Sequence, residues 1–239
     1  MTPTAKSELT PAGKLRVGVN LGNFLLVTKD PASGELRGVV PDLAAELARR
    51  LDTTAELIGY PGAGQLADAA GTGAWDVGFI GAEPQRAAVI EFTLAYVEIP
   101  ATYLVPAGSP IRAIGEVDRP GIRVATAARS AYDLYLSRNL KHARLVRAEG
   151  IPASYDLFVK DKLDVLSGLL PRLTTDVTRL PGARILDGRF TAIQQAIGTP
   201  KARIAGAAYL REFVADIKAS GLVASLIARH GVKGISVAP

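Results

Sequence analysis

The chain has 239 residues, and its 48% hydrophobic content is enough for one large core or two smaller ones. The absence of cysteine excludes disulfides and thiol catalysis, and the two histidines lie too far apart to suggest a metal site, so we expect neither metal nor cofactor. The net charge of +5 comes with a basic stretch over 119–147, but acids interrupt it and no nucleic-acid motif is present, so a solvated basic face is favoured and no nucleic-acid partner is expected.

The first residues, "MTPTAKSELTPAGK", are polar and contain no apolar core of the kind that a signal peptide has. No segment approaches the ~18 continuous apolar residues of a membrane span. Two locations stay open. The protein is cytoplasmic if this N-terminus is native, and it is exported if the chain is a mature form whose leader was replaced by a start methionine.

The first part of the chain alternates short apolar runs with helical patterns. In the expected helix, Leu43, Leu47 and Leu51 share one face, and Pro41 with Asp42 supplies its start. Apolar strands separated by helices are typical of a parallel sheet that is covered on both faces. In chain order the expected elements are strand 14–19, helix 42–51, strand 54–60, a short helix within 62–72 and strand 75–80.

The same alternation restarts after the loop "PAGSP" and predicts a second α/β unit. The expected elements are strand 121–126, helix 131–140, strand 143–148, helix 153–162, strand 163–168, helix 170–179, an extended strand 189–198, and helices 202–219 and 221–230. Ligands of open α/β sheets usually bind at the carboxyl ends of the strands. Two units therefore predict two candidate crevices.

Four stretches, in order along most of the chain, carry a resemblance to a known family. They are "LRVGVN" with "GELRGVVPDLAAELARRL", then "GAWDVGFIGAEPQRAAVIEFTLAYVE", "GIRVATAARSAYDLYL" and "AYLREFVADIKASGLVASLIARHG". Together they resemble the extracytoplasmic solute-binding proteins of polar amino-acid ABC importers, the family 3 periplasmic binding proteins.

The resemblance implies an α/β protein of the two-lobe periplasmic-binding-protein-like type (type II), with two hinge strands. Lobe one would comprise 13–104 and 196–239, lobe two 105–195, and 1–12 would be an N-terminal tail. A small carboxylate or amino-acid-like ligand would bind between the lobes, and hinge closure would signal occupancy to a membrane ABC permease. The resemblance thus implies a periplasmic, monomeric transport protein that is not an enzyme.

Arg86 follows a buried strand in "GAEPQR". Pro84 suits the first helical position, which places Glu83 at the N-cap and Arg86 at the third helical position. A cation there opposes the helix dipole, whereas its planar fork can grip a carboxylate. In the family this arginine binds the ligand's α-carboxylate. We therefore favour a ligand anchor over an exposed arginine at a helix start.

The other candidate ligand residues have structural alternatives. Ser130 starts a Ser-x-x-Asp capping box, and the family places a hydroxyl there that meets the same carboxylate. Asn20 and Asn23 are either ligand contacts or turn residues. Phe24 either stacks on a ligand or belongs to the core. Gln194, in the expected second hinge strand, is a further candidate.

Two positions depart from the amino-acid-binding pattern. Family members carry an aspartate where this chain has Leu169, and a serine or threonine where it has Gly81. Both changes remove partners for a buried ammonium, which is expensive to leave unpaired. An organic acid, an aromatic acid or a modified amino acid fits better, although Glu83 could supply the missing acid and keep an amino acid possible.

Two rival functions use the same scaffold. Prephenate/arogenate dehydratases resemble these binding proteins, but their chemistry needs a general acid, and Glu83 is the one carboxylate that we can place near Arg86. A stand-alone sensory domain would have the same fold. DNA-binding regulators are disfavoured because no helix-turn-helix precedes residue 13.

Overall fold

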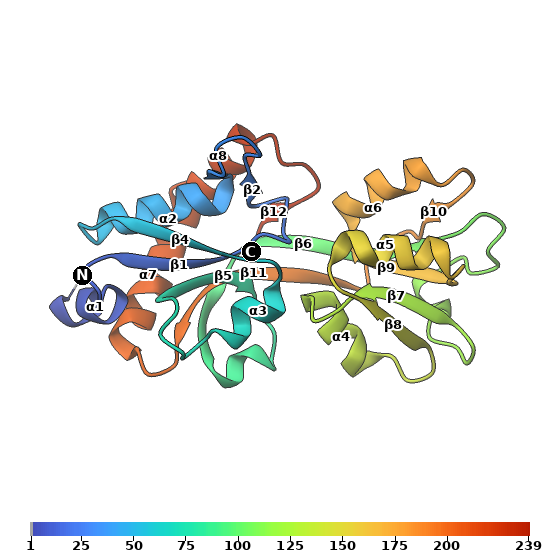
Figure 1. Ribbon diagram of the computed structural model, residues 1–239, viewed down its shortest axis with the longest axis horizontal. Coiled ribbons are helices and arrows are strands. Elements are labelled where there is room, and N and C mark those ends of the chain that lie inside the picture. Colours follow the sequence, from blue (N-terminus) through green and yellow to red (C-terminus); the bar gives the residue numbers. More distant parts are fainter. Residues whose placement is uncertain (1) are drawn as a thin grey trace. The chain divides into compact units, whose positions relative to one another are not determined.

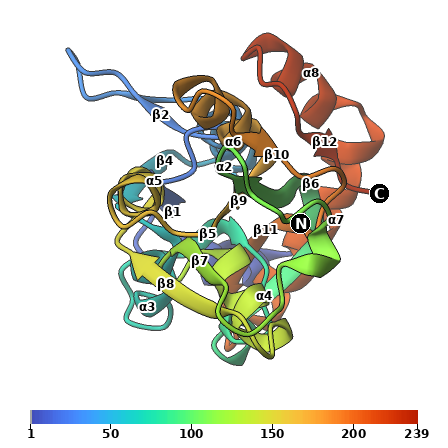
Figure 2. The same ribbon diagram turned by 90° about the vertical axis from the view of Figure 1, so that its right-hand side faces the viewer.

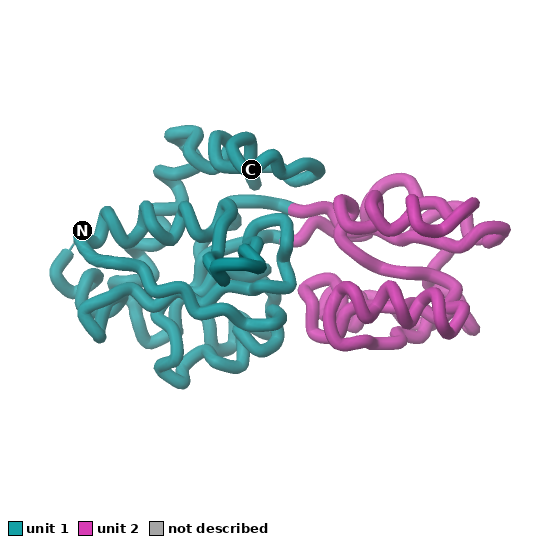
Figure 3. The backbone as a smooth tube through the Cα atoms, turned by 45° about the horizontal axis from the view of Figure 1, so that its top comes forward, with its two compact units in different colours: residues 1–98, 194–239 teal, residues 99–193 magenta. Residues whose placement is uncertain are grey.

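The computed structural model describes residues 2–239, and the chain divides into two compact units. The first unit comprises Met1–Glu98 with Gln194–Pro239, and the second is Ile99–Ile193 (Figure 3). Two long strands, β6 (Ile90–Val105) and β11 (Thr191–Pro200), each run from one unit into the other. The lobe bounds that the resemblance implies, 104/105 and 195/196, fall within these two strands.

The first unit is built on a sheet in the order β4 (Ala55–Tyr60), β1 (Leu15–Asn20), β5 (Val77–Gly81), β11 and β6. β1 is parallel to β4 and to β5, whereas β11 is antiparallel to β5. The short β12 (Ser236–Val237) pairs with β6, and β2 (Thr28–Lys29) forms a separate hairpin with β3 (Leu36–Arg37). The parallel strands therefore end at a common edge.

Helices cover both faces of this sheet: Figure 1 shows α2 (Val39–Arg50) above it and α3 (Ala63–Asp68) below. Leu66 of α3 packs with Trp75 and Ile80 in one core cluster. The unit is completed by α7 (Ile204–Ala219), which packs against α8 (Leu222–Arg229).

Helix α2 begins at Val39, before the expected start at Pro41. Gly38 precedes it with φ +132°, a value that side chains disfavour, and a Cβ there would lie 2.5 Å from the Leu26 carbonyl oxygen. The close approach of this backbone segment therefore requires glycine. The expected tail also contains structure, because Pro3–Leu9 form helix α1, which packs against α7 and buries Leu9 completely.

The second unit has a sheet in the order β6, β9 (Val165–Leu169), β7 (Arg123–Ala127) and β8 (Arg144–Ala148), with β10 (Arg184–Ile185) also paired to β6. β7 is parallel to β8 and β9, and β6 is antiparallel to β9. Its helices are α4 (Ala131–Asn139), α5 (Ile151–Lys160) and α6 (Leu170–Asp176), with 3₁₀ turns η2 (Ile114–Glu116) and η3 (Val177–Arg179).

Alternate strand residues of the second unit point to opposite faces of its sheet, as a pleated strand requires. Val124 and Val165 join the core cluster that contains Leu136 of α4, whereas their neighbours Ala125 and Leu166 join the cluster with α5 and α6. The end-on view in Figure 2 also shows α4 and α5 on different sides of β7. The predicted α/β class is confirmed.

In each unit, a buried or half-buried aspartate forms hydrogen bonds with an arginine at the amino ends of the strands; we call this pair a clamp. Asp76 is fully buried and accepts hydrogen bonds from the Arg16 backbone N–H (3.1 Å) and from Arg16 Nε (2.9 Å), and it pairs with Arg203 (2.8 Å). Asp164 accepts the corresponding bonds from Arg123, at 2.8 and 3.1 Å. Both clamps lie at the edge opposite to the carboxyl ends.

Candidate functional site

The first unit gathers seven of the predicted site residues at the carboxyl edge of its sheet. Asn20 pairs with Tyr60 and Val19 with Phe79, so the segments that follow β1 and β5 leave from the same edge. The Gln194 carbonyl accepts a hydrogen bond from the Ala82 amide (2.8 Å), which brings β11 to this edge as well. The residues on these segments are Asn20, Asn23, Phe24, Gly81, Glu83, Arg86 and Gln194.

The predicted helix that starts at Pro84 is wrong. The segment forms a three-residue 3₁₀ turn, Arg86–Ala88, in which the Glu83 carbonyl accepts hydrogen bonds from the amides of Arg86 (2.9 Å) and Ala87 (3.0 Å). A single turn has too few aligned peptides for a large macrodipole. The dipole argument for Arg86 therefore falls away.

Burial and a hydrogen bond distinguish Arg86 instead. Its side chain is only 5% exposed, and Nη1 donates to the Gly81 carbonyl oxygen at 2.6 Å. The alternative of a solvent-exposed arginine is therefore wrong. A buried guanidinium stays charged and needs acceptors around it. Glu83 is also buried, at 9% exposure, so this edge concentrates two ionisable side chains in a desolvated position.

The segment after β1 has both turn and candidate-site features. Asn20 Oδ1 accepts a hydrogen bond from the Gly22 amide (3.0 Å), which is the turn role. Asn23 is 5% exposed, and its Oδ1 has no hydrogen-bond partner within residues 2–239. Phe24 is 39% exposed, so the alternative that it belongs to the core is wrong. A buried acceptor and an exposed ring thus lie next to each other in the chain at this edge.

Gln194 leads to a residue that the sequence analysis missed. Its Nε2 donates to Glu98 Oε2 at 3.3 Å. Glu98 also lies 3.4 Å from the Ser236 hydroxyl. The sequence signal for Glu98 is a single acid in the apolar run "YVEIP". One isolated acid in a strand is too weak a signal to predict a binding site.

The second unit places Ser130 and Leu169 at its own carboxyl edge, because β7 and β9 run in parallel with Ala125 opposite Leu166. Ser130 caps α4, and its Oγ accepts a hydrogen bond from the Asp133 amide (3.1 Å). Arg129 has φ +58°, and its amide donates to Asp133 Oδ2 (2.8 Å). Left-handed backbone in a residue other than glycine carries strain, which often marks a binding site.

A hydrogen-bonded network holds this turn. Asp133 is 2% exposed and accepts a hydrogen bond from Arg147 Nε (2.9 Å). Tyr132 is also buried, its hydroxyl has no hydrogen-bond partner within residues 2–239, and burial raises the pKa of its phenol above the ordinary value. The phenol is therefore neutral at physiological pH.

Leu169 ends β9 as a buried apolar residue, and a second missed residue follows it. Arg172 lies in the first turn of α6, directly after Pro171, and its Nε donates to both carboxylate oxygens of Asp176 at 2.9 Å. A proline and an arginine after a buried strand also mark "GAEPQR", so the same signal in "GLLPRL" would have found Arg172.

Two α/β units, each with polar side chains at the carboxyl edge of its sheet, define a two-lobe ligand-binding protein of the periplasmic binding type. The sequence model of bacterial extracellular solute-binding proteins, family 3, matches residues 15–233, and the chain belongs to this family. The predicted family is therefore confirmed. No curated protein matches the chain. Within residues 2–239, no helix is long and apolar enough to cross a membrane, and no cluster of three or more acidic or histidine side chains could hold a metal ion.

Solved structures share the fold across nearly the whole chain. A binding component of an ABC transporter from Wolinella succinogenes, complexed with lysine, has a TM-score of 0.78 at 21% identity and covers 93% of this chain and 97% of its own. An ancestral amino acid-binding protein, a precursor of cyclohexadienyl dehydratase, gives 0.76 at 20%, covering 94% and 98%. A histidine kinase sensor domain with similarity to periplasmic binding proteins gives 0.78 at 19%, covering 94% and 98%.

Proposed function

We propose that the chain is the solute-binding protein of an ABC importer, that it works in the periplasm with a membrane permease, and that Arg86 anchors the carboxylate of a small solute. One observation carries the proposal: a buried arginine is held by the Gly81 carbonyl at the carboxyl edge of a sheet, in a chain of the solute-binding family. A guanidinium binds carboxylates through paired, charge-assisted hydrogen bonds. Its placement in a desolvated position strengthens such a contact.

Further contacts are proposed from both units. The Ser130 hydroxyl accepts a bond from the Asp133 amide and still has its own hydrogen to donate to a carboxylate. Asn23 offers a buried amide group, and Phe24 offers an exposed ring on which a planar or apolar part of the solute stacks. Asn20 and Gln194 complete the proposed set.

The proposed site differs from the amino-acid-binding pattern at the two positions that would meet an ammonium group. Gly81 has no side chain and Leu169 has an apolar one, so neither supplies a side-chain acceptor. We therefore propose that the solute is a carboxylate without a free α-ammonium. The alternative is an amino acid whose ammonium is met by Glu83, the buried acid three residues before Arg86.

Native mass spectrometry of the purified protein, followed by calorimetric titration with matched pairs of carboxylates that differ in the α-ammonium, tests the proposal. Arg86→Lys keeps the charge but loses the fork, and we expect binding to weaken at least tenfold. Arg211→Ala, which removes an exposed arginine of α7, is the control and should bind as wild type. Unchanged binding by a folded Arg86→Lys protein would refute the anchor.

Two alternative functions, a dehydratase and a sensory domain, are also tested, because solved structures with this fold include a dehydratase precursor and a sensor domain. A dehydratase would convert prephenate or arogenate, and conversion that is lost in Glu83→Gln would replace the binding proposal. A sensory role would leave ligand binding intact and would show as binding to a receptor partner in place of a permease.

A further inference from the structure

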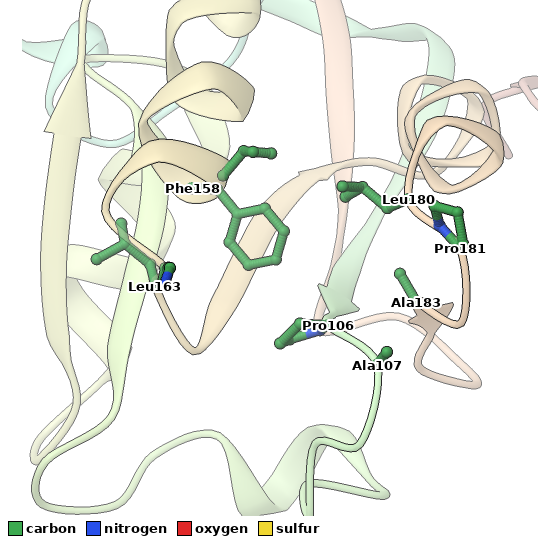
Figure 4. Close-up of a pocket in the computed structure, with 9 residues that line it drawn as sticks. Pro106, Ala107, Phe158, Leu163, Leu180, Pro181 and Ala183 are labelled. Atoms are coloured by element: carbon green, nitrogen blue, oxygen red, sulfur yellow. The ribbon is translucent and has the colours of Figure 1, made fainter.

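The second unit contains a pocket of about 310 Å³ that is unconnected with the candidate ligand residues. It lies between the end of β6, the C-terminal end of α5 and the loop after η3 (Figure 4). Leu163 lines it just before β9 begins, whereas Leu169 ends β9 at the opposite edge of the sheet. The five residues of β9 span roughly 16 Å. The pocket is therefore separate from the edge where Ser130 and Leu169 lie.

Eight of the nine residues that line this pocket are apolar. Figure 4 shows the Phe158 ring pointing into the space, with Leu180 and Pro181 across from it and Pro106 below. Phe158 and Leu163 are buried members of the core cluster beneath α5, so the pocket opens directly onto the core. Small-molecule sites are typically ~300–1,000 Å³, and an apolar cavity of about 150 Å³ already holds benzene. An aryl ring or a short acyl chain fits this volume.

One charged residue, Lys162, lines the pocket. Its side chain is exposed, and within residues 2–239 its ammonium makes no hydrogen bond or ion pair. Lysine commonly lays its methylene stem along apolar surface while the ammonium stays in water. A single cation at the rim of an apolar pocket is complementary to a molecule with an apolar body and one negative charge.

The backbone at Lys162 favours a different residue. It follows α5 with φ +47°, and the Leu163 amide donates to the Phe158 carbonyl (3.0 Å), a bond typical of helix ends where glycine takes the left-handed position. The Lys162 carbonyl also accepts a hydrogen bond from Arg123 Nη2 (2.6 Å), which fixes the turn. Glycine would fit this turn with less strain. A lysine at a position that favours glycine therefore suggests that its side chain has a binding role.

We propose that this pocket is a second binding site, for a small amphiphilic monocarboxylate whose aryl or short acyl group fills the apolar space and whose carboxylate pairs with Lys162. The proposal is independent of the solute bound at Arg86. It assigns a ligand class to the second unit alone.

Octanoate is the probe, with octanol as the uncharged analogue and acetate as the charge without the apolar body. Backbone amide chemical shifts locate binding: we expect octanoate to shift the amides of Ala107, Leu163 and Ala183, and to do so equally in Arg86→Ala or Arg86→Lys. Acetate should leave these amides unshifted. Absence of these shifts with octanoate, or their loss in both Arg86 variants, would overturn the proposal.

Two variants separate charge from shape. Lys162→Gly relieves the backbone, so the melting temperature should hold or rise, while octanoate binding weakens about fivefold, as expected for an exposed ion pair, and octanol binding stays the same. Val159 is 44% exposed and lines the pocket, so Val159→Glu should fold normally and repel octanoate. Asp52→Gly changes a left-handed residue (φ +50°) of the first unit and should not affect octanoate. Wild-type octanoate affinity in both Lys162→Gly and Val159→Glu would refute the site.

Discussion

We predict that removing the Tyr96 hydroxyl will stabilise this protein. Tyr96 is fully buried, its ring packs edge-on against Phe79 (centroids 5.8 Å apart), and its hydroxyl has no hydrogen-bond partner within residues 2–239. Burial also raises the pKa of the phenol, so the group is neutral. A buried polar group without a partner costs about 1–3 kcal/mol. Tyr96→Phe keeps the ring and removes this penalty.

We therefore expect Tyr96→Phe to raise the free energy of unfolding by about 1–2 kcal/mol, with a melting temperature about 2–4 °C higher for each kcal/mol. Urea denaturation and calorimetry measure the two quantities. Tyr103→Phe is the matched control, because the Tyr103 hydroxyl is not among the buried atoms without a partner, and no gain is expected there. A loss of 1 kcal/mol or more in Tyr96→Phe would show that an internal water satisfies the hydroxyl and would refute the reasoning.

Two further predictions concern α2. Gly38→Ala should lower the free energy of unfolding, measured in urea, by at least about 2 kcal/mol, because it combines an unfavourable φ with a contact on the Leu26 carbonyl. Gly71→Ala is the control: Gly71 has a positive φ but open space, so the loss of stability should be smaller. Equal losses would contradict the steric argument. A hydrogen bond from Arg49 lowers the pKa of Glu46 to about 2, so its stabilisation is full above pH 4.5 and is lost as the pH falls towards 2. Glu46→Gln should flatten the acid side of the stability profile, and a profile parallel to wild type would exclude this pair as a contributor.

Hydrophobic periodicity predicted most of the fold because burial on one or two faces leaves a direct trace in sequence. The expected strand 54–60 is β4, and the expected helix 131–140 is α4. The start of α2 was placed too late, since Gly38 offers no capping side chain and the constraint comes from Leu26, twelve residues earlier. Helix α1 carries too few apolar residues to show a pattern, and it depends on α7 for its burial.

The candidate site was less predictable than the fold. Proline before Arg86 indicated a helix start, but the chain continues into β6 after one turn. Phe24 is exposed because the segment after β1 leaves the sheet edge, a fact that composition does not reveal. Glu98 has its partner, Gln194, far away in the sequence, and pairing of this kind follows from tertiary placement. Arg172 pairs with Asp176 within one helix, at a spacing of four residues, so this contact was open to prediction from the sequence.

The two strands shared by both units also set an order for folding during synthesis. Residues 99–193 are continuous, so the ribosome completes the second unit before it makes the last part of the first. The first unit begins earlier but waits for β11, which pairs with β5, and for α7. Domains generally fold as units when their residues are available. The first unit is therefore the unit whose translation begins first and whose folding is completed last. Until residue 200 emerges, the edge of β5 that will pair with β11 is unpaired and needs protection from other strands.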